Sequence, residues 1–117
     1  MTTIPASRST SAEPRSSIDL HPEHRHIVDA ILRRHIPQYE VWAFGSRVSG
    51  QAKPYSDLDL VVVGDRPLPL AVRAALSEAF SDSDLPFKID IVDWATTSES
   101  FRRIIEREKQ VIQRPQQ

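Results

Sequence analysis

Two aspartates, Asp57 and Asp59, have the residue type and spacing needed for chemistry on a phosphate. One residue separates them at the start of a strand-like segment, so their carboxylates are expected on the same face. Carboxylates this close repel each other and raise each other's pKa unless a cation lies between them. Mg²⁺ suits all-oxygen ligands and is usually held by one or two carboxylates together with substrate phosphates. The alternative is a pair of solvated acids at the start of a strand.

Ten residues separate Asp57 from an upstream glycine turn, Gly45-Ser46. Glycine lets backbone N–H groups approach an anion without a Cβ in the way, and a short helix beginning after Gly45 would favour a phosphate. Ser46 can add a hydroxyl donor, and Arg47 can add a charge that steadies a triphosphate. An ordinary strand-to-helix turn is the alternative for this pair alone. The Gly45-Ser46 turn and the two aspartates together indicate a site for a divalent metal and a polyphosphate. Nucleotidyl transfer uses this combination.

A third carboxylate on a neighbouring strand would complete such a site, and Asp90 and Asp93 are the candidates. Side chains alternate between the two faces of a strand. Asp93 shares the face of the apolar residues Phe87, Ile89 and Ile91, whereas Asp90 lies on the opposite face. We therefore choose Asp90, with a solvent-facing acid as the alternative.

The elements that must position these residues alternate between strands and helices. Apolar spacing in the first helix singles out Ile27, Ala30 and Ile31, with Leu32 as a further candidate. Thr96 with Glu99 fits a capping box for the last helix. This alternation predicts an α/β fold, a small mixed β-sheet with helices packed on it. The expected strands cover residues 39–44, 58–63 and 87–92, and the expected helices cover 22–36, 68–80 and 96–112, the last ending before Pro115.

Length and composition set limits on this fold. The 117 residues suit one domain, and residues 1–20, rich in Ser, Thr and Pro, are expected to form a disordered tail ahead of a domain over 21–117. A formal net charge of −1 gives no reason to expect stable nucleic-acid binding. The longest apolar run, Leu60–Val63, is far below the ~18 residues of a membrane span. The lack of cysteine excludes thiol chemistry and fits a cytoplasmic protein.

The spacing Gly45-Ser46, ten residues, Asp57-Leu58-Asp59, followed by a later strand acid, resembles the minimal nucleotidyltransferases (MNT) of the DNA polymerase beta-like superfamily. The fuller pattern Gly-Ser-Arg-x-x-Gly is also present, and Ser56 precedes the acid pair. The likeness covers roughly residues 25–113 and implies the polymerase beta-like nucleotidyltransferase fold.

The resemblance also implies roles for single residues. Gly45 and Ser46, with Arg47 and Ser56 beside them, would bind the nucleoside triphosphate. Asp57 and Asp59 would hold two Mg²⁺ ions, and Asp90 would ligate one of them and receive the proton of the acceptor hydroxyl. Attack on the α-phosphate would release pyrophosphate.

Relatives of this kind are commonly paired with a HEPN-type RNase as toxin and antitoxin, and the small protein transfers AMP from ATP to a tyrosine of the toxin. The resemblance therefore implies a protein adenylyltransferase that acts as an antitoxin in a hetero-oligomer. Two alternatives stay open: an antitoxin that neutralises its partner by binding alone, and a nucleotidyltransferase for small molecules such as antibiotics.

The histidines and tryptophans suggest no further site. His24 and His26 would not share a helix face, so a metal site near the cluster that they form with His21 is not expected. Trp42 and Trp94 are expected in or beside the core.

Overall fold

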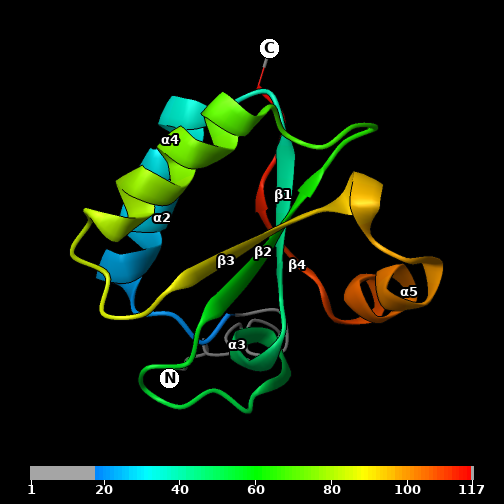
Figure 1. The fold of residues 1–117 in the computed structure, drawn as a ribbon. Coiled ribbons are helices and arrows are strands. Elements are labelled where there is room, and N and C mark those ends of the chain that lie inside the picture. Colours follow the sequence, from blue (N-terminus) through cyan, green and yellow to red (C-terminus); the bar gives the residue numbers. More distant parts are fainter. Residues whose placement is uncertain (1–17, 117) are drawn as a thin grey trace, which may run out of the picture.

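The computed structural model describes residues 18–116, which form a mixed four-stranded sheet with helices on both faces (Figure 1). Across the sheet the strand order is β3-β2-β1-β4. β1 runs antiparallel to both β2 and β4, whereas β2 and β3 are parallel. The predicted fold class is confirmed. The strands are β1 (Glu40–Phe44), β2 (Leu58–Val63), β3 (Ile89–Asp93) and β4 (Gln110–Gln113).

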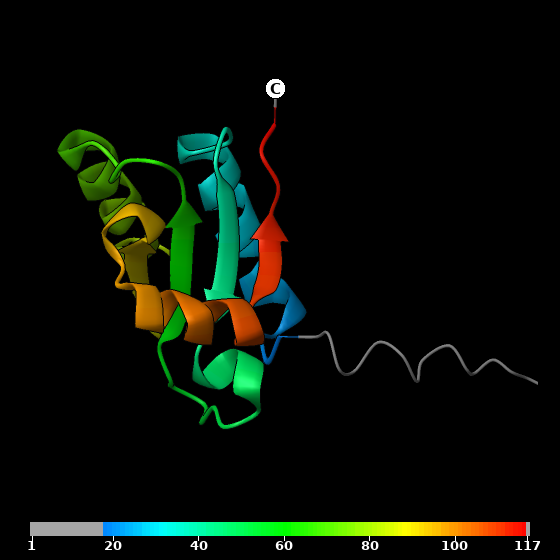
Figure 2. The same cartoon turned by 90° about the vertical axis from the view of Figure 1, so that its right-hand side faces the viewer.

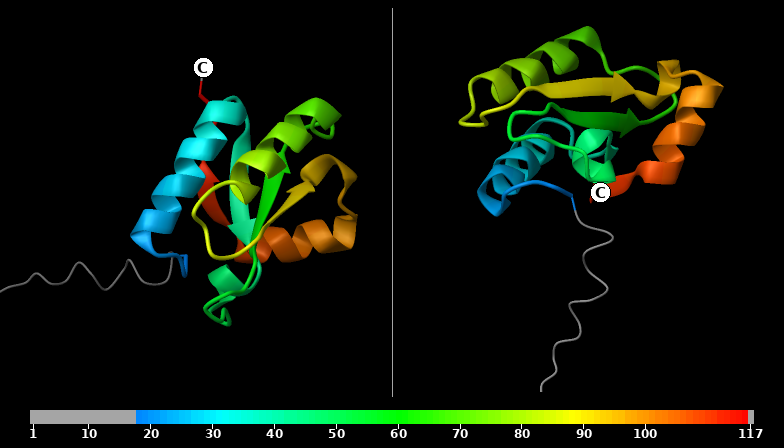
Figure 3. Two further views of the ribbon diagram at one scale, coloured as in Figure 1. Left: turned by 60° about the vertical axis from the view of Figure 1, so that its left-hand side comes forward. Right: turned by 90° about the horizontal axis from the view of Figure 1, so that it is seen from below.

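Two helices, α2 (Pro22–His35) and α4 (Leu70–Ser81), lie side by side on one face of the sheet (Figure 3). Pro22 occupies the first turn of α2, where its missing N–H costs nothing, and the His21 side chain accepts a hydrogen bond from the backbone at Glu23. The helices cover the larger apolar core. Its fully buried members include Val28, Leu32, Ile36, Leu58, Leu60 and Leu76.

The opposite face carries a smaller core beneath α5 (Glu99–Glu108), which crosses the strands (Figure 2). Ile105 of α5 is fully buried there among side chains of β1 and β2. Trp42 meets Trp94 edge to face at 5.2 Å, and the Lys109 ammonium lies 3.7 Å from the centre of the Trp42 ring. No helix within residues 18–116 is long and apolar enough to span a bilayer.

The remaining elements are short. A single helical turn, α3 (Ser46–Ser49), follows β1 directly at one end of the sheet, and the loop from Gly50 to Asp57 leads from it into β2 (Figure 1). At the other end, η3 (Trp94–Thr96) follows β3.

The prediction of a last helix reaching residue 112 is wrong. The Ser98 side chain, not Thr96, caps α5, and the helix ends at Glu108. The chain then forms β4, in which Val111 pairs with Trp42 of β1. Pairing with a buried strand outweighs the helical spacing of the apolar residues here, and β-branched residues suit a strand.

Two smaller predictions also need correction. In α2 the buried residues are Val28 and Leu32, whereas Ala30, expected in the stripe, is exposed. Ile18 and Leu20, assigned to the tail, pack against the core, so the domain begins earlier than residue 21. The rest of the predicted tail, residues 1–17, lies outside the described residues.

Asp93 fixes the end of β3 against α4. Asp93 is 6% exposed, and its carboxylate accepts a hydrogen bond from the Leu68 backbone N–H at 3.0 Å and pairs with the Arg73 guanidinium. Arg73 also donates to the Ile91 carbonyl at 3.1 Å. A buried acid with these partners is structural, which supports the choice of Asp90 over Asp93 for the site.

Replacing Asp93 should destabilise the fold. Asp93→Ala leaves the Leu68 N–H and the Arg73 charge without their partner, and we expect a loss of about 3 kcal/mol in the free energy of unfolding, measured in urea. Asp90→Ala, on the same strand but exposed, is the matched control and should change stability by less than about 0.5 kcal/mol. Equal losses in the two variants would contradict this division of roles.

Candidate active site

The predicted acids meet where β2 and β3 begin. Parallel pairing places Asp59 opposite Asp90, and antiparallel pairing places Asp59 opposite Phe44 at the end of β1. Asp57 lies two residues before Asp59, and the charges of both Asp57 and Asp90 act on the Asp59 carboxylate. The structure therefore brings all three sequence-predicted acids into one electrostatic group.

Asp59 is the most perturbed member of this group. Burial, followed by the charges of Asp90 and Asp57, raises the pKa of Asp59 from 3.8 to about 6. A cation among the three carboxylates would favour the ionised form and remove this penalty.

The donor set fits Mg²⁺ in chemistry, since each ligand would be a carboxylate oxygen. Even so, no group of three or more His, Cys, Asp or Glu side chains in residues 18–116 is arranged to hold a metal ion by itself. Of the three acids, Asp90 is exposed and lies on the edge strand of the sheet. The remaining ligands for Mg²⁺ would come from substrate phosphates.

The backbone conformation and the packing at position 45 both require glycine. Its φ of +86° and ψ of −158° belong to a backbone region that is essentially restricted to glycine. A Cβ at this position would overlap the Asp59 carboxylate. The turn therefore passes directly against the central acid, which joins the predicted phosphate turn to the predicted metal site.

The N-terminal end of α3 lies at this turn, as the sequence predicted. The Gly45 carbonyl accepts hydrogen bonds from Val48 and Ser49, each at 3.0 Å. The Gly45 N–H donates to Glu108 Oε1 at 3.2 Å. Sequence reasoning missed Glu108, although this residue interrupts the apolar stripe of the last helix and so signalled a polar partner.

The predicted contact between Arg47 and a triphosphate does not fit the position of this residue. Arg47 is 6% exposed, and its guanidinium donates to the carbonyls of Asp19, Pro54 and Ser56 at 2.8, 3.0 and 2.9 Å. It also lies over the Phe87 ring, 4.2 Å from the centre. Arg47 thus holds the phosphate turn and the following loop in place.

Ser46 and Ser56 belong to the same end of the sheet. Ser46 opens α3 directly after Gly45. The Ser56 hydroxyl accepts a hydrogen bond from the Lys53 N–H at 2.8 Å and so closes the turn before the acid pair. Their predicted contacts with a nucleotide stay predictions.

A family model described as a nucleotidyltransferase domain matches residues 25–114. This chain belongs to that family. The nucleotidyltransferase domain is also 53% identical over 98 residues to the probable protein adenylyltransferase MntA of Haemophilus influenzae. That match covers 84% of this chain and 86% of the relative.

Solved structures share the fold of this nucleotidyltransferase domain. A toxin–antitoxin crystal structure with AMP-PNP matches with a TM-score of 0.65 and 24% identity, covering 79% of this chain and 74% of the other. A chain in the structure of a tri-AMPylated Shewanella oneidensis HEPN toxin in complex with an MNT antitoxin matches with a TM-score of 0.54 and 22% identity. The match covers 75% of this chain and 71% of the other. At these identities the likeness establishes the fold alone.

The raised pKa of Asp59 should make stability depend on pH. The folded protein holds this proton more tightly than the unfolded chain, so the stability due to Asp59 is full below about pH 4 and is lost as the pH rises through about 6. Asp59→Asn should therefore gain about 1 kcal/mol over the parent between about pH 4 and pH 8, after allowance for solvent screening. Urea unfolding at both pH values measures this gain. The exposed-acid control Asp65→Asn should show none.

The two left-handed glycines provide a matched pair of variants. Gly50→Ala meets no atom within 4 Å and has only the strain of φ +87°, about 1 kcal/mol. Gly45→Ala meets the Asp59 carboxylate as well, so nucleotidyl transfer should fall about a hundredfold or more because the acid is displaced. Transfer rates and urea midpoints of both variants test this, and equal activity in the two would contradict the proposed close approach.

Proposed function

We propose that this protein is a Mg²⁺-dependent protein adenylyltransferase of the cytoplasm. It acts as an antitoxin by transferring AMP from ATP to a tyrosine hydroxyl of a partner HEPN-type toxin, with which it forms a hetero-oligomer. The 53% identity to the probable protein adenylyltransferase MntA, extending over most of both chains, carries this proposal. The acid group around Asp59 supports it.

Each residue of the site has a role that depends on its position. The Gly45 turn and the Ser46 hydroxyl bind the triphosphate next to Asp59. Asp57, Asp59 and Asp90 would hold Mg²⁺, which when bound neutralises phosphate charge and stabilises the entering and leaving oxygens. Asp90 receives the proton of the acceptor hydroxyl. A bond then forms from the acceptor oxygen to the α-phosphorus, and the bond from that phosphorus to pyrophosphate breaks.

The relatives support a protein as the acceptor. The structural neighbours include a tri-AMPylated HEPN toxin in complex with an MNT antitoxin. A protein partner would supply the acceptor side chain and would be silenced by the added nucleotide. A HEPN-type toxin is therefore the substrate to examine.

Intact-mass measurement tests the reaction directly. The parent protein, incubated with ATP, Mg²⁺ and a HEPN-type toxin, should add AMP groups to that toxin. Asp59→Asn and Asp90→Asn should each reduce the rate by about a hundredfold or more, because each loses a metal ligand or the proton acceptor. Asp65→Asn, an exposed acid outside the site, should retain the rate of the parent.

Two outcomes would contradict the proposal. If the parent protein forms no AMP adduct on the toxin, the proposed enzymatic activity is contradicted. Full neutralisation of the partner by the double variant Asp57→Asn, Asp59→Asn would favour an antitoxin that acts by binding alone.

A further inference from the structure

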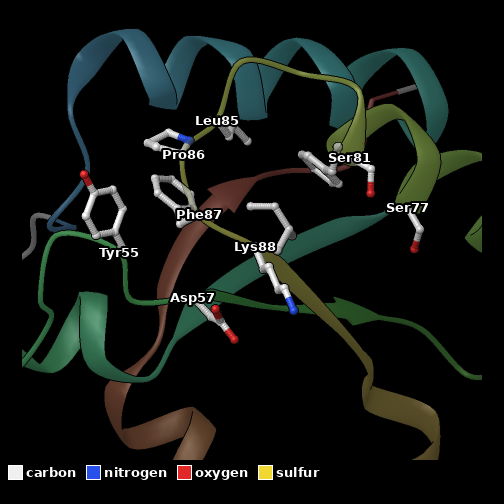
Figure 4. A pocket seen from close by; sticks show the side chains of 10 residues that line it. Tyr55, Asp57, Ser77, Ser81, Leu85, Pro86, Phe87 and Lys88 are labelled. Carbon is white, nitrogen blue, oxygen red and sulfur yellow. The ribbon is translucent and has the colours of Figure 1, made fainter.

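Asp59 and Asp90 lie on the face of the sheet that α5 covers. Side chains alternate along β2, so Asp59 shares its face with Val61, which is buried beneath α5. The neighbouring Leu58 and Leu60 face α2 and α4. A cavity of about 710 Å³ lies beside α4, and neither Asp59 nor Asp90 lines it (Figure 4). A nucleotide therefore reaches these two acids from the side of α5.

Apolar contacts fix α5 in place on this face. The Phe101 ring meets the Phe44 ring edge to face at 5.7 Å, and Ile105 is fully buried. Glu108 follows Ile105 by three residues and Phe101 by seven, so all three lie on one side of the helix. The Glu108 side chain therefore extends from a helix whose position is set by packing against the sheet.

Glu108 restrains the N–H side of the Gly45 turn. The Gly45 N–H donates to Glu108 Oε1 at 3.2 Å. The Gly45 carbonyl is restrained separately, because it accepts hydrogen bonds from Val48 and Ser49 of α3, each at 3.0 Å. Two consecutive peptide planes are thus fixed, the first by α5 and the second by α3.

The orientation of the Ser46 N–H follows from these restraints. The Gly45–Ser46 peptide bond is trans, so its N–H points opposite to its carbonyl, which points into α3. Within residues 18–116 the Ser46 N–H donates to no protein acceptor. Glycine adopts many backbone conformations, so the φ of +86° at Gly45 depends on a restraint from outside the turn. Glu108 supplies that restraint.

We propose that Glu108 is a positioning residue for the nucleotide. As a hydrogen-bond acceptor it holds the Gly45 turn in the conformation that presents the Ser46 N–H to the triphosphate. The inference rests on the proposed adenylyl transfer and adds a residue from α5 to the groups that serve it. The role requires an acceptor oxygen at position 108 and no negative charge, since a charge beside a triphosphate is repulsive.

Two substitutions at position 108 separate the acceptor from the charge. Glu108→Ala removes the acceptor and should raise the Kd for AMP-PNP with Mg²⁺, and lower kcat/KM for ATP, about tenfold or more. The KM for the HEPN-type toxin should stay within about twofold of the parent value. Glu108→Gln keeps an acceptor oxygen and should stay within about threefold of the parent in all three constants.

Glu106→Ala is the matched control, because Glu106 is an exposed acid on the same helix. It should leave the Kd for AMP-PNP at the parent value, with all proteins compared where urea unfolding shows them to be folded. Parent-like or tighter binding by Glu108→Ala would overturn the positioning role. Equal impairment of Glu108→Gln and Glu108→Ala would overturn it as well.

Hydrogen exchange of the Gly45 amide tests the contact without any nucleotide. This N–H should exchange about tenfold or more faster in Glu108→Ala than in the parent, and at nearly the parent rate in Glu108→Gln. Equal exchange in Glu108→Ala and the parent would contradict the inference, even for an active transferase. If the parent modifies no protein, the proposed function fails, while the exchange and AMP-PNP measurements still decide the role of Glu108.

Discussion

The parallel pairing of β2 with β3 is the constraint on which the site depends. It fixes Asp59 beside Asp90 through backbone hydrogen bonds, whatever their side chains prefer. Burial of Asp59 and, after it, the charge of Asp90 oppose the ionised form of Asp59, and they raise its pKa to about 6. On the other face of β2, Leu58 and Leu60 are fully buried in the larger core. This apolar packing stabilises the pairing of β2 with β3 despite the unfavourable environment of the Asp59 carboxylate. Ionisation of Asp59 is therefore unfavourable at the place where the protein is expected to bind a cation.

A second set of contacts keeps the Gly45 turn against these acids. Gly45 approaches the Asp59 carboxylate, Glu108 accepts the Gly45 N–H, and Arg47 binds three carbonyl oxygens from the flanking chain. The same guanidinium lies over the Phe87 ring. One buried cation thus links the segment near Asp19, the Gly45 turn and the segment that leads into β3. Rigid positioning of this kind is what an in-line transfer needs.

The sequence alone predicted the parts of this arrangement that depend on local pattern. The bounds of β2 are as expected because its apolar run is ended by Gly64 on one side and polar residues on the other. Alternation along β3 places Asp90 and Asp93 on opposite faces, and in the structure Asp93 is buried and paired with Arg73 whereas Asp90 is exposed.

Other parts could not be read from local pattern. Val111 and Ile112 continue a helical stripe but pair with β1, and that partner lies about seventy residues away along the chain. Arg47 has the type and place of a phosphate ligand, yet folding brings three carbonyl oxygens around it. The hydrogen bond from the Gly45 N–H to Glu108 likewise forms only when distant segments meet.

The edge-to-face contact of Trp42 with Trp94 has a practical consequence. These are the only two tryptophans of the chain, and they lie together beneath α5, on the face of the sheet that carries Asp59. Lys109, at the end of α5, lies over one of them. The intrinsic fluorescence of the protein therefore originates from a single location, and any displacement of α5 would change its intensity without an added label.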